Sequence, residues 1–433
     1  MPVRPPTGLR SAGMDECLDR FEVADDKTES TAAGGVIADG AAPGGRRLRI
    51  AIVSPPFLPL PPPGYAGTER VVTALALGLH QRGHQVTVFA PGDSDLPCEV
   101  IPTRSRSVWQ GADRADTTGY LQHTLARVWE RADAFDIIHS HLDADGLLMA
   151  RYCPTPVLST LHTRLDDAGV ADLIDALPDV PLVAISESQR RWHERAGWVA
   201  TIHHGLGFDA TPFEECPGGY LLLVGRVSPE KGVAEAIEVA RRTGRRLVMA
   251  AKVRRPEEAT MFEAIVRPAI DDGTIDWRGE VGTDERDRLM AGAEATLMLG
   301  AWPEPFGLVA IESMATGTPV IGRRAGGLTE TIRHGESGYL VDDVEEAVLA
   351  VSRVRDLPRE PIAAYARSAF SAERMVGRYE AAYAAVLAGR RADRSASASR
   401  RDRRMSLDGA GPGRLGRSRR RTLREAVARS TAR

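Results

Sequence analysis

Short apolar runs alternate with amphipathic segments along most of the chain. The first run, within "RRLRIAIVSPP", is β-branched and stopped by prolines, which is typical of a buried strand in a parallel sheet. In "TERVVTALALGLHQRGH" apolar residues recur at helical spacing, and Gly83 predicts the end of that helix. Helical segments such as 117–133 and 187–196 separate several further strand-like runs. These runs are "QVTVFAP", "FDIIHSH", "TPVLSTLH", "PLVAIS" and "VATIHHG".

The same alternation restarts after "HHGLGFDATPFEECPGG", a segment without apolar periodicity that we interpret as a linker. Alternating strands and helices indicate parallel sheets covered by helices on both faces. We therefore predict an α/β protein with two Rossmann-like, doubly wound domains that face each other across a cleft, at 47–205 and 206–372. A terminal helix at 373–388 can cross back to the N-terminal domain. The strand-like runs of the second domain are "YLLLVGR", "RLVMAAK", "GTIDWRG", "EATLML", "TPVIG" and "SGYLVD".

The two ends of the chain differ from its middle in composition. Residues 1–46 are rich in Gly, Ala, Pro and Asp without apolar periodicity, and we predict a disordered leader. Residues 389–433 carry 15 arginines and four acidic residues, a net charge of +11, although the whole chain has −3. We predict a disordered tail with either no role or non-specific contact with a polyanion such as anionic lipid. Sequence-specific nucleic-acid binding is not expected.

The composition is that of a soluble globular protein, with 43% hydrophobic and 27% charged residues. No apolar run reaches the roughly 18 residues of a membrane helix, and the N-terminus has no signal-peptide core. The four cysteines lie far apart without CxxC spacing, which indicates reduced thiols and neither a disulfide framework nor a zinc site. We expect a cytoplasmic protein whose basic tail can contact the inner membrane face peripherally.

Candidate chemistry gathers where predicted strands end. Ligands of doubly wound sheets bind beyond the carboxyl ends of the strands, which places the site in the cleft between the domains. "GRVSPEKG" follows a strand and opens a helix, so Arg226 and Lys231 with free backbone N–H groups suit a pyrophosphate. The spacing is not that of a Walker A loop, and a solvated turn is the alternative. Lys252 ends the next strand and is expected to face the same cleft.

The first strand–helix connection, "PPPGYAGTERVV", offers a second anion-ready helix start. Gly64 and Gly67 allow close backbone approach, and Thr68 is predicted to cap the helix. His162 ends the strand "VLSTLH" and faces the predicted cleft. The pair His203-His204, at the domain junction, is predicted to be structural.

Asp143-Ala144-Asp145 spells the DxD pattern with which some sugar-transfer enzymes hold a divalent ion. The match is short, and Asp143 can instead cap a helix. We therefore predict no metal site.

The stretch "AWPEPFGLVAIESMATGTPVIG" carries two glutamates eight positions apart. Glu304 lies in the loop after a strand, and a helix is predicted from near Gly307 to Gly317. Glu312 falls between one and two turns into that helix. Two carboxylates around a helix start form a polar site, although two surface glutamates would give the same pattern.

The sequence E-P-F-G-L-x-x-x-E, followed by "GTPVIGRRAGGLTE", closely resembles the E-x7-E signature of family 4 glycosyltransferases of the GT-B fold. The resemblance covers about 47–388. It includes the glycine loop 64–70, His162, "GRVSPEKG", the two glutamates and "GGLTE" in family order.

This resemblance implies a role for each matching position. Arg226 and Lys231 would bind the donor diphosphate, and Glu312 the ribose. Glu304 would hold donor-sugar hydroxyls, with the backbone amides of Phe306, Gly307 and Leu308 beside it. His162 would contact the donor sugar, and Gly67 would lie near the phosphate and the acceptor. Ala66 departs from the family, which often has two adjacent glycines there, and an alanine could narrow the room for donor or acceptor.

The resemblance implies a retaining transferase that moves a hexose from a nucleotide-diphosphate sugar, UDP-glucose by default, to an acceptor hydroxyl. The acceptor would be a sugar, a lipid or a small molecule. No metal ion and no other cofactor is expected. Three alternatives stay open: a nucleotide-sugar epimerase of the same architecture, a polyanion-binding protein acting through its tail, and a glycan phosphorylase. The last would need a pyridoxal-phosphate lysine, for which the folded body offers only Lys231 and Lys252.

Overall fold

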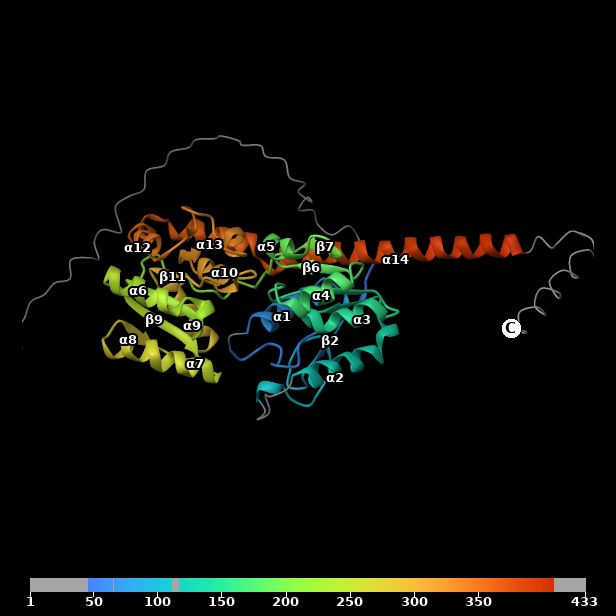
Figure 1. Cartoon of the computed structure of the whole chain (residues 1–433), viewed down its shortest axis with the longest axis horizontal. Coiled ribbons are helices and arrows are strands. Elements are labelled where there is room, and N and C mark those ends of the chain that lie inside the picture. The colour runs from blue at the N-terminus through green and yellow to red at the C-terminus, as the bar shows by residue number, and fades with distance from the viewer. Residues whose placement is uncertain (1–45, 65, 111–116, 409–433) are drawn as a thin grey trace, which may run out of the picture. The chain divides into compact units, whose positions relative to one another are not determined.

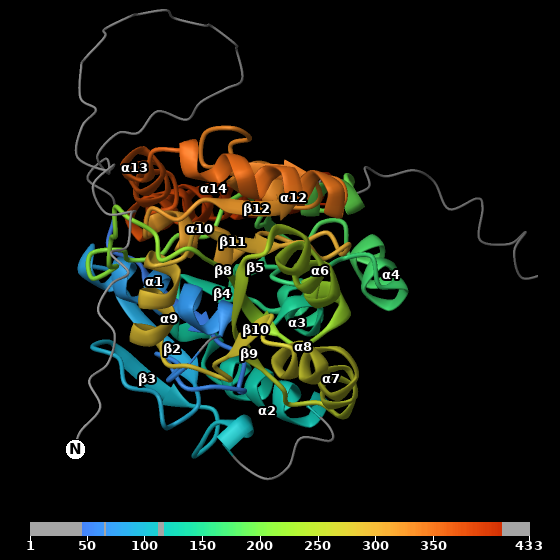
Figure 2. The same ribbon diagram turned by 90° about the vertical axis from the view of Figure 1, so that its left-hand side faces the viewer.

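The computed structural model describes residues 46–64, 66–110 and 117–408. The predicted leader, apart from Arg46, and the last part of the predicted tail lie outside these ranges. The described chain forms two parallel sheets, each covered by helices (Figures 1 and 2). The prediction of an α/β fold with two doubly wound domains is therefore confirmed.

The first sheet has seven parallel strands in the order β3-β2-β1-β4-β5-β6-β7. The order reverses at β1, so β1 and β4 are neighbours although two strands separate them along the chain. The strands are β1 (Arg49–Val53), β2 (Gln85–Ala90), β3 (Glu99–Pro102), β4 (Ile137–Ser140), β5 (Val157–Thr160), β6 (Leu182–Ala184) and β7 (Trp198–Thr201). The helices between them are α1 (Gly67–Gln81), α2 (Thr118–Trp129), α3 (Leu147–Tyr152), α4 (Ala168–Ala176) and α5 (Glu187–Arg190).

The second sheet has six parallel strands in the order β10-β9-β8-β11-β12-β13. Its strands are β8 (Tyr220–Arg226), β9 (Arg246–Lys252), β10 (Ile275–Trp277), β11 (Ala295–Met298), β12 (Val320–Arg323) and β13 (Gly338–Val341). The helices are α6 (Val233–Thr243), α7 (Pro256–Met261), α8 (Arg267–Asp271), α9 (Thr283–Ala291), α10 (Leu308–Ala315), α11 (Leu328–Thr331), α12 (Val344–Arg353) and α13 (Arg359–Ala369).

The period-two geometry of β8 explains why helices cover both faces of the second sheet. Leu221 and Leu223 belong to one buried cluster, which includes residues of α6 and α12. Leu222 and Val224 belong to another, which includes Met290 of α9 and Val309 of α10. Successive side chains of a strand point to opposite faces, so an uninterrupted apolar run requires a cover on each side.

The chain crosses between the two sheets twice, and the two crossing segments pair with each other. The backbone N–H of Leu206 donates to the carbonyl of Phe370 over 3.0 Å, and the N–H of Ala372 donates to the carbonyl of Leu206 over 2.9 Å. Leu206 and Ser371 thus form a short parallel bridge.

Beyond this bridge α14 (Ala372–Asp408) begins, and its first part, up to Tyr383, packs on the first sheet. The hydroxyl of Tyr383 lies 2.8 Å from Nδ1 of His139 on β4, and that of Tyr379 lies 3.0 Å from the hydroxyl of Thr160 on β5. A Cβ on Gly78 of α1 would lie 2.5 Å from a methyl group of Val376. The helix therefore rests closely on α1 and on the strands below it.

Three local expectations differ from the structure. β3 (Glu99–Pro102) is an additional strand that we missed, since its run is short and ends in proline, which an edge strand tolerates. Thr68 does not cap α1, because the helix already begins at Gly67 with Ala66 as its N-cap.

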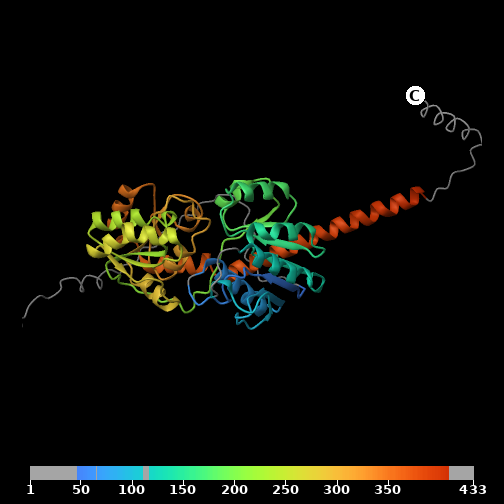
Figure 3. The ribbon, with the colours of Figure 1, turned by 60° about the horizontal axis from the view of Figure 1, so that its bottom comes forward.

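The third difference concerns the tail. Helix α14 continues to Asp408 in Figures 1 and 3, although disorder was predicted from 389. Residues 384–408, which belong to a unit separate from the rest of the chain, are helical throughout. Between Gly389 and Asp408 the chain has no proline and is rich in alanine and arginine, which favour a helix. No helix in the described ranges is both long and apolar enough to cross a membrane.

Candidate active site

Lys231 and Glu304 meet at the carboxyl ends of the neighbouring strands β8 and β11. The ammonium Nζ of Lys231 lies 2.8 Å from Oε2 and 3.1 Å from Oε1 of Glu304, and both side chains are about four-fifths buried. The turn that holds Lys231 packs tightly on the chain that leads to Glu304. A Cβ on Gly300 would lie 2.0 Å from the carbonyl oxygen of Glu230, so only glycine allows this approach.

The loop that carries Glu304 is fixed from its other side by the "GG" of "GGLTE". The N–H of Gly327 donates to the carbonyl of Glu304 over 2.7 Å. A Cβ on Gly326 would lie 2.3 Å from that same oxygen. The next residues, Phe306 and Leu308, are buried, and Gly307 adopts a left-handed φ of +93° as the N-cap of α10. The predicted donor-binding segment 306–308 therefore begins a helix whose position is set by backbone contacts.

Arg226 ends β8 and is held by two carboxylates. Its Nη1 donates to Glu258 over 3.1 Å, and its Nη2 donates to Glu230 over 2.6 Å. Strand register places Lys252 of β9 beside it. The guanidinium is thus fixed near the carboxyl end of β8. Its ion-pair partners, Glu230 and Glu258, differ from that of Lys231, which is Glu304.

Glu312 is almost fully buried on α10 and is neutralised by two arginines. Arg286 of α9, itself buried, lies 3.4 Å from Oε1 of Glu312. Arg70 of α1 forms a second ion pair with the same oxygen. Since α1 belongs to the first sheet, this contact joins the two domains. The sequence placed a carboxylate here but predicted neither arginine.

Gly67, where α1 begins, lies against the start of α10. A Cβ on Gly67 would come within 3.2 Å of Cδ1 of Leu308. The preceding Ala66 is buried. The glycine predicted to lie near phosphate and acceptor is therefore at the junction of the two domains.

His162 is half-buried and belongs to a cluster with the buried histidines His139, His141 and His204 beyond β4 and β5. Its Nε2 lies 2.8 Å from Nδ1 of His141, and its ring stacks on that of His204 at 5.1 Å. His204 in turn packs edge-on against Phe306. Burial lowers the pKa of His162 to about 3 and that of His141 well below its ordinary value, so both rings are neutral near pH 7.

The DxD pattern has a structural use. Oδ1 of Asp143 accepts the backbone N–H of His162 over 2.5 Å and that of Thr163 over 3.2 Å. Burial raises the pKa of Asp143 to about 6. Asp143 begins a 3₁₀ turn but its carboxylate holds the loop after β5, so the alternative of a helix cap was wrong in detail. Within the described ranges no three His, Cys, Asp or Glu residues are grouped as metal ligands would be.

Comparisons with known proteins agree with this geometry. The family model described as Glycosyltransferase Family 4 matches residues 65–206, and the model described as Glycosyl transferases group 1 matches residues 217–368. Together these matches span both sheets. The chain belongs to the family 4 glycosyltransferases. Its two facing α/β domains are those of the GT-B fold.

A curated relative of this glycosyltransferase is the "D-inositol 3-phosphate glycosyltransferase" of Mycolicibacterium smegmatis, 27% identical over 83% of this chain and 96% of the relative. Among solved structures, AviGT4, "a glycosyltransferase involved in Avilamycin A biosynthesis", is 26% identical with a TM-score of 0.60, over 79% of this chain and 98% of that one. Anabaena Alr3699/HepE, "in complex with UDP and glucose", is 17% identical with a TM-score of 0.61, over 77% and 98%. The last likeness shows the fold alone.

Two contacts between the glycosyltransferase domains were not foreseen from the sequence. The carboxylate of Glu330 accepts the backbone N–H groups of Glu187 and Ser188 over 2.9 and 2.8 Å, and it contacts Nε2 of His203 at 2.9 Å. Burial alone would raise the pKa of Glu330, but these hydrogen bonds lower it. The hydroxyl of Ser186 donates to the carbonyl of Pro305 over 2.6 Å, directly beside Glu304. The sequence does not reveal these contacts, because the partners lie more than a hundred positions apart.

Arg164 and Trp302 form a further contact beside the site. The guanidinium lies 3.5 Å from the centre of the indole ring. Arg164 follows His162 by two residues, and Trp302 precedes Glu304 by two. A cation–π pair thus spans the domains next to the residues predicted to contact the donor sugar.

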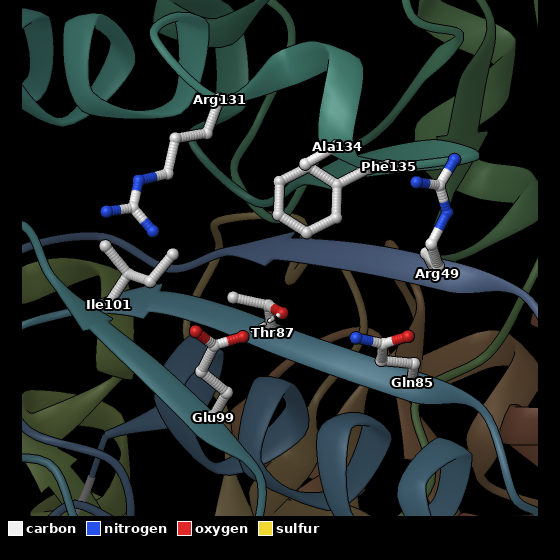
Figure 4. Close-up of a pocket in the computed structure, with 8 residues that line it drawn as sticks. All are labelled: Arg49, Gln85, Thr87, Glu99, Ile101, Arg131, Ala134 and Phe135. Carbon is white, nitrogen blue, oxygen red and sulfur yellow. Dashed lines mark hydrogen bonds between the residues drawn. The ribbon is translucent and has the colours of Figure 1, made fainter.

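A cavity of about 180 Å³ lies near the amino ends of β1, β2 and β3, away from the strand ends that carry the candidate site. Figure 4 shows side chains of β1, β2 and β3 around it, together with three residues of the segment that precedes β4. Strands begin here rather than end, and none of the predicted site residues lines the cavity. Its lining residues are Arg49, Gln85, Thr87, Glu99, Ile101, Arg131, Ala134 and Phe135.

Proposed function

We propose that this glycosyltransferase transfers a hexose from a nucleotide-diphosphate sugar to an acceptor hydroxyl with retention of configuration and without a metal ion. The observation that carries the proposal is the contact of Lys231 with Glu304 at adjacent strand ends. A cation suited to a diphosphate and a carboxylate suited to sugar hydroxyls therefore lie side by side, as binding of the two joined parts of such a donor requires.

In the proposed reaction the leaving diphosphate gains charge while the sugar becomes oxocarbenium-like. The Lys231 ammonium has three donors, so it can hold a phosphate oxygen while it stays beside Glu304. Fixed cations stabilise the leaving group without reorganisation, which is the role that a divalent ion has in other transferases. Arg226, fixed by Glu230 and Glu258, supplies the second positive charge at the same edge.

The Glu304 carboxylate lies where it can bind donor-sugar hydroxyls and stabilise positive charge on the sugar. His162 of the first domain would contact the donor sugar as a neutral hydrogen-bonding group, since burial lowers its pKa to about 3. Glu312 would bind the ribose, for which its ion pair with Arg70 must loosen. Close contact between the domains excludes water, which would otherwise hydrolyse the donor.

The donor is best tested by thermal shift with UDP-glucose, GDP-mannose and ADP-glucose, with UDP alone and UMP as references. A ligand that binds only the folded state raises the melting temperature. We expect one nucleotide series to give a clear shift, larger for UDP than for UMP if the diphosphate is recognised in that series. UDP-glucose is the first donor to test, because the Anabaena neighbour was solved with UDP and glucose. Absence of any shift would contradict the proposal.

Turnover then separates transfer from the alternatives. D-inositol 3-phosphate is the first acceptor to test, because the relative in M. smegmatis is named for it. Nuclear magnetic resonance of the product should show the anomeric configuration of the donor. An altered sugar formed without acceptor would instead indicate an epimerase. EDTA should leave the rate unchanged, and metal-dependent turnover would contradict the metal-free mechanism and favour Asp143 and Asp145 as ligands.

A further inference from the structure

His141 forms a hydrogen bond with Nε2 of His162, so this ring nitrogen is not available to a substrate. The two rings share one hydrogen bond, 2.8 Å between Nδ1 of His141 and Nε2 of His162. The second nitrogens, Nε2 of His141 and Nδ1 of His162, are shielded from solvent and have no hydrogen-bond partner among the described residues. Buried polar atoms are nearly always paired, so an unpaired ring nitrogen beside the site indicates a missing partner.

We propose that His141 is a positioning residue that makes Nδ1 the only nitrogen through which His162 contacts the donor sugar. The inference rests on the proposed function, in which His162 contacts that sugar. His141 touches neither donor nor acceptor in this account and acts only through His162.

The neighbours of the pair hold both rings in place. His139 lies 4.1 Å from His141 between ring centres, and both its nitrogens are engaged, with the hydroxyls of Tyr383 and Thr160. On the other side His204 stacks on His162 at an interplanar angle of 21°. A ring flip of His162 would therefore break its bond to His141 without forming another within this cluster.

The shared proton links the states of the two rings. Each neutral imidazole carries one N–H, so one ring must donate across the bond. If His141 donates from Nδ1, His162 carries its own proton on Nδ1 and donates to the sugar. If His162 donates from Nε2, its Nδ1 accepts from a sugar hydroxyl, and His141 carries its proton on Nε2. His141 thus determines whether His162 is a donor or an acceptor toward the substrate, with both rings neutral throughout.

The first test is a double-mutant cycle on turnover of UDP-glucose, or of the sugar nucleotide that gives the largest thermal shift. We expect His141→Leu to lower kcat/KM about 10- to 100-fold, as loss of an orienting partner does in other sites. In a His162→Ala background the same change should cost less than about twofold, because residues that act through one contact are not additive. His84→Leu is the control, because that histidine bonds to Leu48 and Glu380 outside this cluster, and it should cost the same in both backgrounds. Equal losses for His141→Leu in both backgrounds would overturn the proposal.

Conservative variants keep the test valid if His141→Leu does not fold. The amide of Asn lies where Nδ1 of a histidine lies, whereas that of Gln reaches the place of Nε2. His141→Asn should therefore retain most activity and His141→Gln should not. Equal activity of the two variants would contradict the proposal. A fully active His162→Ala variant would instead contradict the role of His162 in the proposed function.

A second measurement needs no substrate. Nitrogen-15 spectra of the histidine rings should show His162 of the unliganded protein in hydrogen-bonded form. In His141→Gln its two ring nitrogens should shift, while in His141→Asn they should stay close to their original positions. Unchanged His162 signals in His141→Gln would show that the bond does not control the ring, and the proposal would fall even if turnover were lost.

Discussion

The candidate site lies where the strands of both sheets end, and we call the carboxyl ends of the strands of each sheet its edge. The two edges differ in how they hold their polar groups. The edge of the first sheet presents neutral histidines that bond to one another and to hydroxyls. The edge of the second sheet presents charged groups in pairs, of which Lys231 with Glu304 and Arg286 with Glu312 are examples. The first edge is suited to uncharged sugar hydroxyls, whereas the second is suited to a phosphate and to a sugar that gains positive charge.

This difference also explains which groups tolerate burial. Burial favours the neutral form of a histidine at little cost, so four can lie together. A buried carboxylate or guanidinium needs a partner, so the charged edge is built from pairs that a donor must share or separate. Substrate binding should therefore disturb the second edge more than the first.

The largest effect is expected from Glu304→Gln. The amide keeps the size and most hydrogen bonds of the carboxylate but loses its charge. Turnover should fall about 10²- to 10³-fold, as when one preorganised group is removed from other active sites, while donor binding changes little. Steady-state kinetics with thermal-shift titration measure the two quantities. Glu336→Gln, on an exposed turn, is the control, and a fully active Glu304→Gln enzyme would contradict the assigned role.

Glu312→Gln tests whether the charged edge depends on its buried pairs. The change leaves Arg70 and Arg286 facing a neutral amide. The free energy of unfolding, measured in urea, should drop by about 3 kcal/mol. Arg70→Leu should cost less, since Arg286 still neutralises the carboxylate. If both variants cost the same, the two arginines do not share Glu312.

Lys231→Ala should weaken binding of UDP about 10- to 100-fold, because hydrogen bonds to charged groups contribute about 1.5–3 kcal/mol. The variant also leaves Glu304 without its cation beside a phosphate. Isothermal titration with UDP, or with GDP or ADP if the donor screen selects those, measures the loss. Lys231→Arg keeps the charge and should lose less. Unchanged affinity of Lys231→Ala would place the diphosphate elsewhere.

The neutral histidines at the edge of the first sheet should make the free energy of unfolding depend on pH. Burial lowers the pKa of His139 and His162 to about 3, from 6.5. The unfolded chain therefore protonates first, and stability present above pH 6.5 is lost as pH falls toward 3. Each histidine that protonates on unfolding contributes up to about 1.4 kcal/mol per pH unit.

Two buried acids act in the opposite direction. Burial raises the pKa of Asp143 to about 6 and that of Glu69 to about 7, although the charge of Lys252 lowers the latter. Their contribution is lost as pH rises through 3.8–6 and 4.5–7. Urea titrations at pH 7, 6 and 5 should show a net fall in stability, steeper in Glu69→Gln and shallower in His139→Asn. Stability that rose on acidification would contradict the neutral cluster.

The smallest effect is expected at the end of the chain. Residues 390–433 follow the part of α14 that Tyr379 and Tyr383 anchor to the first sheet. Their removal should leave turnover on a soluble acceptor within about twofold of the full chain. A large loss would show that the basic end takes part in catalysis or in substrate capture.

The local patterns predicted the fold because each strand and helix carries its own signal. Apolar runs of four to seven residues marked most strands, and the stretch from Glu304 to Glu312 placed a carboxylate on either side of a helix start. β3 escaped because four residues ending in proline carry too little signal. The terminal helix at 373–388 is predicted, but not its continuation to Asp408, because basic composition indicates disorder although arginine and alanine also form good helices.

The partners within the site could not be predicted in the same way. Arg70 and Glu312 are 242 positions apart, and nothing in either local sequence indicates the other. The sequence places His141 at the end of a strand but does not reveal its bond to His162, which depends on the register of β4 against β5. Which residues lie at a strand end is local information. Which side chains meet there depends on packing across the whole domain.

The bridge between Leu206 and Ser371 limits how this molecule can move. The two connections lie side by side and form one hinge. The domains can therefore rotate about the Leu206–Ser371 bridge, whereas sliding of one domain along the other would break it. Gly205 makes this closeness possible, because a Cβ there would lie 2.2 Å from the carbonyl oxygen of Ser371. A single methyl group at Gly205 would therefore push these two connections apart and act on the movement of one domain against the other.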